Sequence, residues 1–342
     1  MTDRLSYRDA GVDLDAAERT KDRLKELVAS TRDRFTLSEM GAFGGLYRVP
    51  DDVAEPVLVS SADGVGTKLK IAFRAGRHDT VGQCLVNHCV NDILVQGAKP
   101  LFFLDYLATG EMDEAVVHDV VHGVALACKE NGCALLGGET AQMPDFYAEQ
   151  EYDLAGFIVG IVPHGRILDG SEIREGDVLV GLESNGLHTN GFTLARRIVF
   201  EVMGLGVSDD FPGTGRSVAE ELLRVHRSYL PLLRPLLEAG RIRGLAHVTG
   251  GGIPGNLPRV LPDGLGAEVR TGSWTVPTVF RTLQEAGNVA REEMDRVFNM
   301  GVGMVVVTRP NDAGAVIAAA EAADVGAAEI GSVVPGSGVR YQ

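Results

Sequence analysis

The stretch Asp63-Gly64-Val65-Gly66-Thr67-Lys68 gives the first strong indication of what this sequence folds into and binds. It follows Pro56–Ser60, an apolar run that predicts a short buried strand, and α/β folds bind ligands in loops that follow strands. Its glycines let the backbone approach phosphates, its aspartate suits magnesium and its lysine suits phosphate charge. From these residues alone, a triphosphate site and an ordinary tight turn are equally favoured. The stretch is not a Walker loop, because no Gly-Lys-Ser/Thr follows a glycine and four variable residues.

Outward from this stretch, strands and helices alternate in two series. Helices are predicted in the first series at Ala16–Ser30, Thr80–Gly97 and Asp113–Asn131, and strands at Leu101–Leu107, Cys133–Leu136 and Asp153–Val162. The second series has helices near 192–203, 217–239, 277–287 and 313–323, and strands near 177–182, 245–249, 266–270, 304–308 and 329–334. The polar, glycine-punctuated segment 164–176 separates the two series. The fold class is α/β, of the α+β type, with an N-terminal domain at 1–170 and a C-terminal domain at 171–342.

The bulk composition supports a globular protein and disfavours some partners. The 342 residues are 45% hydrophobic and carry a net charge of −15, which repels nucleic acid and anionic membrane. This charge equally fits a protein that is merely kept soluble. Met1–Tyr7 lacks the apolar core of a signal peptide, and the apolar run Leu154–Val162 is too short to span a bilayer. We expect a cytoplasmic protein whose four cysteines are buried thiols.

Acidic residues recur at predicted strand ends and on one helix. Asp92 lies one helical turn after His88, so both side chains face the same way. Asp105 lies inside an apolar strand, where a carboxylate is costly unless it is paired or binds a metal. Glu139 follows two glycines at a strand end. Each residue alone is more often structural, but together they fit magnesium held by oxygen ligands.

Two polar, glycine-containing loops follow strands in the second half. Ser184–Gly191 precedes a predicted helix and contains His188, a candidate acid, base or substrate ligand, although a capping loop is slightly favoured. Gly250–Gly255 formally matches a dinucleotide fingerprint. Prolines after it prevent the long helix that this fingerprint opens, so a phosphate-binding loop is the better interpretation. Asn299–Met304 is interpreted as a helix C-cap followed by a turn.

Taken together, these segments resemble the phosphoribosylformylglycinamidine cyclo-ligase family almost from end to end. The segments that carry the resemblance are Ser6–Asp13, Asp63–Lys68, Arg77–Thr80, Val90–Asp92, Pro100–Tyr106, Gly137–Pro144, His188–Gly191, His247–Gly252 and Phe298–Met304. The wider superfamily, which includes formylglycinamidine ribonucleotide synthetase and selenophosphate synthetase, shares the motifs around Asp63 and Glu139. Segments 6–13 and 100–106 point to the cyclo-ligases in particular.

The resemblance implies a homodimer whose N-terminal sheets join into a barrel. It implies ATP-dependent ring closure of formylglycinamidine ribonucleotide to aminoimidazole ribonucleotide, with magnesium and with potassium as a further candidate. Implied metal ligands are Asp63, Asp92, Glu139 and, with less support, Asp105. Implied nucleotide-binding residues are Asp63, Gly64, Gly66, Thr67, Lys68, Gly138, Thr140, Gly250, Gly251 and Gly252. His188, Asn190 and Lys68 are the implied catalytic residues.

The sequence departs from the family pattern at three places. Ser61-Ala62 replaces a segment with threonine, Met300 stands where cysteine is common, and Arg224–Tyr229 replaces a Pro-Thr-Lys/Arg-Ile-Tyr type of segment. The last departure leaves open whether Arg227 or Tyr229 contacts substrate phosphate. Alternatives are a kinase or selenophosphate synthetase of the superfamily, a dehydrogenase that uses the second glycine loop, and a non-catalytic nucleotide sensor. The absence of cysteine from residues 1–62 disfavours selenophosphate synthetase.

Overall fold

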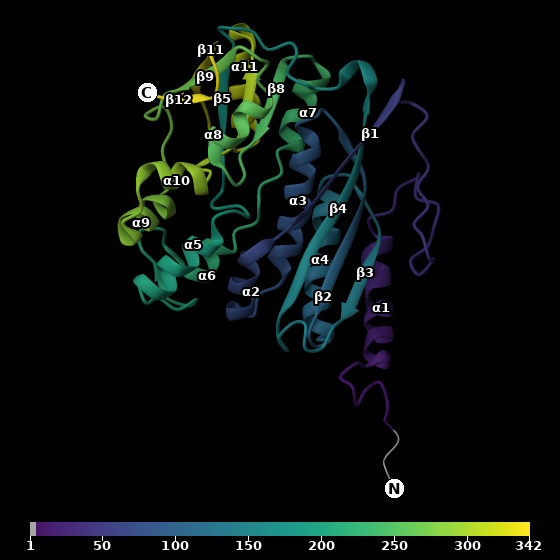
Figure 1. Ribbon diagram of the computed structural model, residues 1–342. Coiled ribbons are helices and arrows are strands. Elements are labelled where there is room, and N and C mark those ends of the chain that lie inside the picture. The colour runs from purple at the N-terminus through teal and green to yellow at the C-terminus, as the bar shows by residue number, and fades with distance from the viewer. Residues whose placement is uncertain (1–4) are drawn as a thin grey trace.

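The computed structural model describes residues 5–342 and contains two main sheets, each with its own helices (Figure 1). Residues 1–4, which belong to the segment expected not to be a signal peptide, lie outside the described residues. The first sheet has the order β1-β4-β2-β3, with strands β1 (Pro56–Gly64), β2 (Lys99–Thr109), β3 (Ala134–Gln142) and β4 (Tyr152–Pro163). Its helices are α1 (Leu14–Ala29), α2 (Leu69–Ala75), α3 (Asp79–Leu94) and α4 (Glu114–Glu130). These elements confirm the mixed α/β prediction for the N-terminal half.

Helices α3 and α4 lie against one face of this sheet (Figure 1) and pack closely against each other. A Cβ atom on Gly82 of α3 would collide with the carbonyl oxygen of Val120, and one on Gly123 of α4 with that of Asp79. Glycine at both positions therefore allows the two backbones to approach. Nearly all of α3 is buried, because its other side contacts α7 and β8 of the C-terminal half. α3 is thus the helix that carries N-terminal side chains to the junction of the two halves.

The opposite face of the N-terminal sheet is apolar and open in this chain. Leu58 of β1 is 58% exposed and Phe157 of β4 is 47% exposed. Residues that alternate with them, such as Val59 and Ile158, face the helices and pack into the core. The sheet therefore buries one face within the chain and leaves the other face exposed.

The C-terminal half is built on a six-stranded sheet of order β12-β9-β11-β5-β10-β8. Its strands are β5 (Val178–Glu183), β8 (Ile242–His247), β9 (Leu265–Val269), β10 (Val302–Thr308), β11 (Ala327–Pro335) and β12 (Val339–Tyr341), and β6 (Asp210–Phe211) pairs separately with β7 (Arg216–Ser217). Its helices are α5 (Phe192–Arg196), which continues as a π-helix at Arg197–Val202, α6 (Val218–Leu222), α7 (Leu230–Glu238), α8 (Gly252–Asn256), α9 (Thr278–Gly287), α10 (Arg291–Val297) and α11 (Pro310–Ala322). The five principal strands predicted here are confirmed, whereas the short strands β6, β7 and β12 were not predicted.

The single helix predicted over 217–239 is wrong, because the structure has two helices with an extended segment, 223–229, between them. Pro231 fits the first turn of α7, where its missing N–H costs no hydrogen bond. The extended segment finds its partners on α3 instead: the Asn91 side chain accepts a hydrogen bond from the Tyr229 backbone N–H and donates one to the Arg227 carbonyl oxygen. These bonds satisfy the backbone that a helix would have satisfied internally.

The strand predicted at Cys133–Leu136 is too short, because β3 continues through Gly137–Thr140 to Gln142. Gly138 pairs with Asp105 of β2, and a Cβ on Gly138 would collide with the Asp105 carboxylate. The glycine therefore makes room for a buried carboxylate within the sheet.

None of the helices described within residues 5–342 is long and apolar enough to cross a membrane. All four cysteines are buried and free, as predicted.

Candidate active site

A cavity of about 600 Å³ lies between the two halves of the chain. The N-terminal half lines it with Ser61 and Asp63 at the end of β1 and with His88 and Asp92 on α3. The C-terminal half contributes residues that follow or surround the end of β8, among them His247, Thr249, Asn256 and Arg259. The cleft thus brings Asp63, the first residue of the stretch Asp63–Lys68, near the loop that contains Gly250–Gly252.

Asp63, His88 and Asp92 form a charged cluster in the N-terminal wall. His88 Nε2 lies 2.9 Å from Asp63 Oδ2 and 3.7 Å from Asp92 Oδ2. Burial opposes protonation of His88, but the hydrogen bond to Asp63 and the charge of Asp92 outweigh it and raise the His88 pKa. Burial works against the charge on Asp63 as well, but the hydrogen bond and positive charge of His88, together with the Gly64 N–H, outweigh it and lower the Asp63 pKa. The one-turn spacing of His88 and Asp92 correctly predicted that both face the same way.

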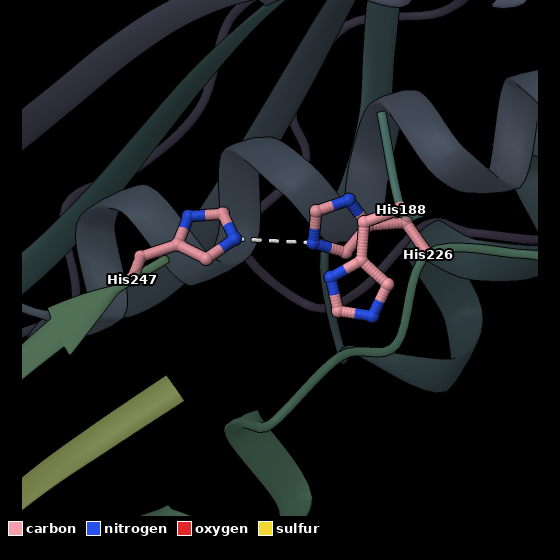
Figure 2. Close-up of side chains that lie close together, drawn as sticks. All are labelled: His188, His226 and His247. Carbon is pink, nitrogen blue, oxygen red and sulfur yellow. Dashed lines mark hydrogen bonds between the residues drawn. The ribbon is translucent and has the colours of Figure 1, made fainter. Parts of the chain in front are cut away.

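Three more histidines, His188, His226 and His247, lie close together (Figure 2), and His247 connects them to Asp92. The Nε2 atoms of His226 and His247 are 3.1 Å apart, and His247 Nδ1 lies 2.8 Å from Asp92 Oδ1. The ring of His188 stacks on that of His226 with 4.0 Å between centroids. Both ring nitrogens of His188 are buried without a hydrogen-bond partner. Burial is the main cause that lowers the pKa of all three groups, well below the usual value for His188 and His226.

Lys68 lies inside the junction rather than on the cleft surface. Its side chain is fully buried, and its ammonium donates to the carbonyl oxygens of His188 at 2.9 Å and Arg224 at 2.6 Å. Cys84 Sγ is a third partner at 3.1 Å. The neighbouring Thr67 hydroxyl lies 3.0 Å from that of Thr193. The structure therefore brings Asp63–Lys68 against the loop Ser184–Gly191. The Lys68 ammonium joins the two segments through its hydrogen bond to the His188 carbonyl oxygen.

Asn190 and the second glycine loop meet beside the cleft. A Cβ on Gly250 would lie 3.3 Å from Asn190 Oδ1. The Gly251 N–H already donates to the Arg296 carbonyl oxygen, and the Asn256 amide donates to the Gly250 and Gly252 carbonyl oxygens. The loop is therefore held in shape, and the helix it opens, α8, has 5 residues. The long helix of a dinucleotide-binding fold is replaced by this short one.

The four candidate metal ligands do not form one cluster within the chain. Asp63 and Asp105 lie in one row of the sheet, separated by Gly156, over which the Phe103 ring packs. Asp105 is buried beneath α4, where burial raises its pKa to about 7. Glu139 pairs with Tyr106, one position along from Asp105, so it points to the open face of the sheet. Only Asp63 and Asp92 of the four reach the cleft.

The remaining candidates have these positions. Gly64 ends β1 and its N–H donates to the Asp63 carboxylate, while Gly66 has a left-handed backbone with φ of 63°. Gly138 and Thr140 lie in β3 and face the helices. Tyr229 is fully buried and its hydroxyl donates to the Glu183 carbonyl oxygen, which places it away from the cleft.

Sequence reasoning singled out neither His226 nor His247 as a site residue. His247 stood within a recognised segment, and its position at the end of β8 was a usable signal. His226 stood in a segment that we expected to be helical. The segment Arg224–Tyr229 departs from the family pattern, and this departure could have indicated that His226 lies in the site.

Similarity to known proteins extends over nearly the whole chain. Residues 44–162 match the family model "AIR synthase related protein, N-terminal domain", and residues 174–342 match the corresponding C-terminal domain. A phosphoribosylformylglycinamidine cyclo-ligase of Sorangium cellulosum is 51% identical over 340 residues, which cover 99% of this chain and 98% of that one. One of Trichlorobacter lovleyi is 53% identical over 310 residues, covering 90% of this chain and 89% of that protein.

Solved structures with the same fold are more distant in sequence. Thiamine-monophosphate kinase from Stenotrophomonas maltophilia superposes with a TM-score of 0.71 at 20% identity, over 94% of this chain and 96% of that one. Hydrogenase maturation protein HypE in complex with ATP superposes with a TM-score of 0.64 at 20% identity, over 92% of this chain and 86% of that one. These similarities concern the fold.

Proposed function

The chain belongs to the phosphoribosylformylglycinamidine cyclo-ligase family, and we propose that the cleft between its two halves is where this ring-closing ligase of purine biosynthesis works. The substrate is then formylglycinamidine ribonucleotide and the product aminoimidazole ribonucleotide. The observation that supports this location best is the meeting of Asp63 and Asp92 with the Thr249–Gly252 loop around one cavity. Carboxylates that can hold a charge-neutralising cation and a glycine loop in one cleft suit phosphoryl transfer.

The proposed chemistry begins with ATP. An amide oxygen is a poor leaving group, so the γ-phosphoryl group is transferred to the formyl oxygen and ADP is released. The amidine nitrogen then attacks the activated carbon, the phosphate leaves with its oxygen, and a proton is lost as the ring closes. The fold relative solved with ATP supports nucleotide binding by this architecture. Positioning and charge neutralisation supply most of the catalysis in such a transfer.

Asp63 and Asp92 are the proposed ligands for a divalent cation, for which the resemblance names magnesium. Both carboxylates line the cavity, and each has an oxygen within 4 Å of His88 Nε2 (2.9 Å for Asp63 and 3.7 Å for Asp92), so carboxylate oxygens that suit a divalent cation gather at this wall. Such an ion neutralises phosphate charge. Glu139 and Asp105 are not proposed as ligands in the same cluster, because the sheet places them elsewhere. Potassium stays a prediction.

Phosphate contacts are proposed for the C-terminal wall. Gly250 lies beside Asn190 in a loop that its own hydrogen bonds hold in place, and Arg259 adds a positive charge to the cavity lining. Arg259 is better placed for this role than Lys68, whose ammonium is already saturated by carbonyl oxygens. We propose that Asn190 contacts the substrate, while Lys68 and His188 position the loop that carries it.

The homodimer is proposed to form through the open face of the N-terminal sheet. This face presents Leu58 and Phe157, and pairing two such faces would bury them in a barrel. We expect Phe157→Glu to convert a dimer into a monomer in light scattering, because it buries a charge at the interface. Leu126→Glu on α4 is the matched control, since Leu126 is 36% exposed and lies on the other side of the sheet. The proposal would be contradicted if both variants were monomeric or if both were dimeric.

One assay tests the proposed function. Purified protein is incubated with formylglycinamidine ribonucleotide, ATP and magnesium, and aminoimidazole ribonucleotide and ADP are measured together. We expect one ADP per ring closed. ADP without ring closure would favour a kinase of this fold, and no consumption of ATP would refute the proposal.

A further inference from the structure

A second large cavity, which we call the linker cavity, lies beside the segment 164–176 that connects the two halves. Its volume is about 610 Å³, and its walls come from the ends of α3 and α7, the adjoining ends of β2, β4 and β8, and residues 166–168. A cavity of this size can enclose most of a small organic molecule. The proposed function uses none of the side chains that line it.

The floor of the linker cavity is apolar. Its lining includes the buried side chains of Leu94 on α3, Ile161 on β4, Leu230 on α7 and Ile242 on β8. These side chains belong to both halves of the chain, so the floor lies where the two halves meet. Buried apolar side chains at the bottom of a cavity favour a ligand with an apolar body.

The two helix ends at the linker cavity already have backbone partners within the chain. Gly97 follows α3 with φ of 79°, and its N–H donates to the Leu94 carbonyl oxygen. Gly240 follows α7 with φ of 65°, and its N–H donates to the Leu237 carbonyl oxygen. Left-handed glycines commonly close helices in this way. The charge preference of the cavity therefore depends mainly on its side chains.

Positive side chains outnumber negative ones around the linker cavity. Three cationic and two acidic residues line it, namely Lys99, Arg166, Arg234, Glu172 and Glu238. Arg234 pairs with Glu238 at 2.9 Å, whereas neither Lys99 nor Arg166 pairs with a carboxylate of residues 5–342. Arg166 instead donates to the backbone carbonyl oxygen of Glu238 at 3.3 Å. Two cations without carboxylate partners suit an anionic group, and they do so in a chain whose net charge is −15.

We propose that the linker cavity binds a small amphipathic anion. An apolar body packs on the floor, and one carboxylate, sulfonate or phosphate group lies beside Lys99 and Arg166. Leu168 lines both this cavity and the cleft, and its N–H donates to the Gln96 carbonyl oxygen at 3.1 Å. The ligand therefore contacts a residue of the cleft wall from outside the cleft.

The test compares two dyes that share one ring system. 1-Anilinonaphthalene-8-sulfonate carries a sulfonate, and N-phenyl-1-naphthylamine is its uncharged counterpart. Each is titrated into the full chain without ATP or substrate, with fluorescence for affinity and calorimetry for stoichiometry. We expect one tightly bound sulfonate dye per chain, and weaker binding as added salt screens the two cations. No saturable binding of the sulfonate dye, or the same response of both dyes to salt, overturns the proposal.

Three charge changes locate the dye. Lys99→Gln removes an unpaired cation and should weaken the sulfonate dye by roughly 3-fold, whereas Glu172→Gln removes a repelling charge and should strengthen it by roughly 2-fold. Lys129→Gln is the matched control, because it removes the same charge from the exposed last turn of α4. The uncharged dye should bind all three variants alike. The proposal is overturned if Lys99→Gln weakens the sulfonate dye no more than Lys129→Gln does, or if Glu172→Gln weakens it.

If Lys99→Gln does not fold, a crystal structure of the unaltered protein with the sulfonate dye replaces it. We expect the naphthalene ring on the apolar floor and the sulfonate within hydrogen-bonding distance of Lys99 or Arg166. A dye bound in the cleft or on the open face of the N-terminal sheet instead would be the contrary result. Neither experiment contains ATP or substrate, so both are independent of whether the protein closes the ring.

Discussion

The two walls of the cleft use the same residue type in opposite states. In the N-terminal wall, two carboxylates face His88 and raise its pKa although it is buried. In the C-terminal wall, His188 and His226 are equally buried but have each other and Lys68 as neighbours, and burial with these positive neighbours lowers their pKa. Burial alone therefore does not decide whether a histidine here is charged. For His88 the two carboxylates outweigh burial, and we propose that they make the N-terminal wall the cation-binding side.

The largest expected effect comes from removing a carboxylate from the N-terminal wall. We expect Asp63→Asn to lower kcat/KM for ring closure by on the order of 100-fold or more, because the cation proposed to neutralise the developing phosphate charge loses a ligand. Asp169→Asn is the control: Asp169 lines the same cavity, but its carboxylate accepts from the Ser171 N–H. Steady-state kinetics decides, and comparable rates for the two variants would remove Asp63 from the metal site.

Next in size is the loss of the buried ammonium that joins the walls. Lys68→Met leaves the carbonyl oxygens of His188 and Arg224 without their donor, and each unsatisfied buried group costs about 1–3 kcal/mol. We expect the free energy of unfolding to fall by about 2–4 kcal/mol in urea denaturation. Lys70→Met, which alters a surface ion pair with Glu151, should cost less than about 1 kcal/mol. A Lys68→Met protein as stable as the Lys70→Met protein would show that the junction does not depend on this ammonium.

Acid should weaken the C-terminal wall. His188, His226 and His247 have lowered pKa values in the folded protein, so the unfolded chain binds more protons as the pH falls below about 6.5. Stability from these groups is fully present above that pH and is lost as the pH falls toward their folded pKa values. We expect unfolding free energies between pH 7 and pH 5 to decline more steeply than in His226→Gln. Parallel pH profiles in the two proteins would contradict this.

The smallest effect concerns the charge state of His88 itself. Its raised pKa means that its contribution to stability is present below about pH 6.5 and is lost as the pH rises through the folded pKa. Asp63→Asn removes the hydrogen bond that raises it, so the His88 pKa measured by NMR titration should fall. An unchanged His88 pKa would mean that the charge of Asp92 is enough to raise it without the Asp63 hydrogen bond.

Particular residues show which sequence-based predictions were confirmed and which were wrong. The prediction that His88 and Asp92 face the same way was confirmed, because their one-turn spacing depends on helical geometry alone. The strand Cys133–Leu136 was predicted to end before Gly137 because glycines commonly end strands, whereas here the buried Asp105 carboxylate requires glycine at position 138 inside the strand. The helix over 217–239 was predicted from its apolar content, but Asn91 offered the backbone of 223–229 a competing set of hydrogen bonds.

The sequence by itself determined the family, the alternating α/β architecture and the two loops that border the cleft, because these depend on local patterns and on the order of motifs. The tertiary structure alone decided which carboxylates meet. Alternation along β3 turned Glu139 to the open face, a two-strand separation kept Asp105 away from Asp63, and the path of 223–229 over α3 brought His226 against His247. Contacts between residues more than a hundred positions apart depend on how whole elements pack, and no local pattern encodes that.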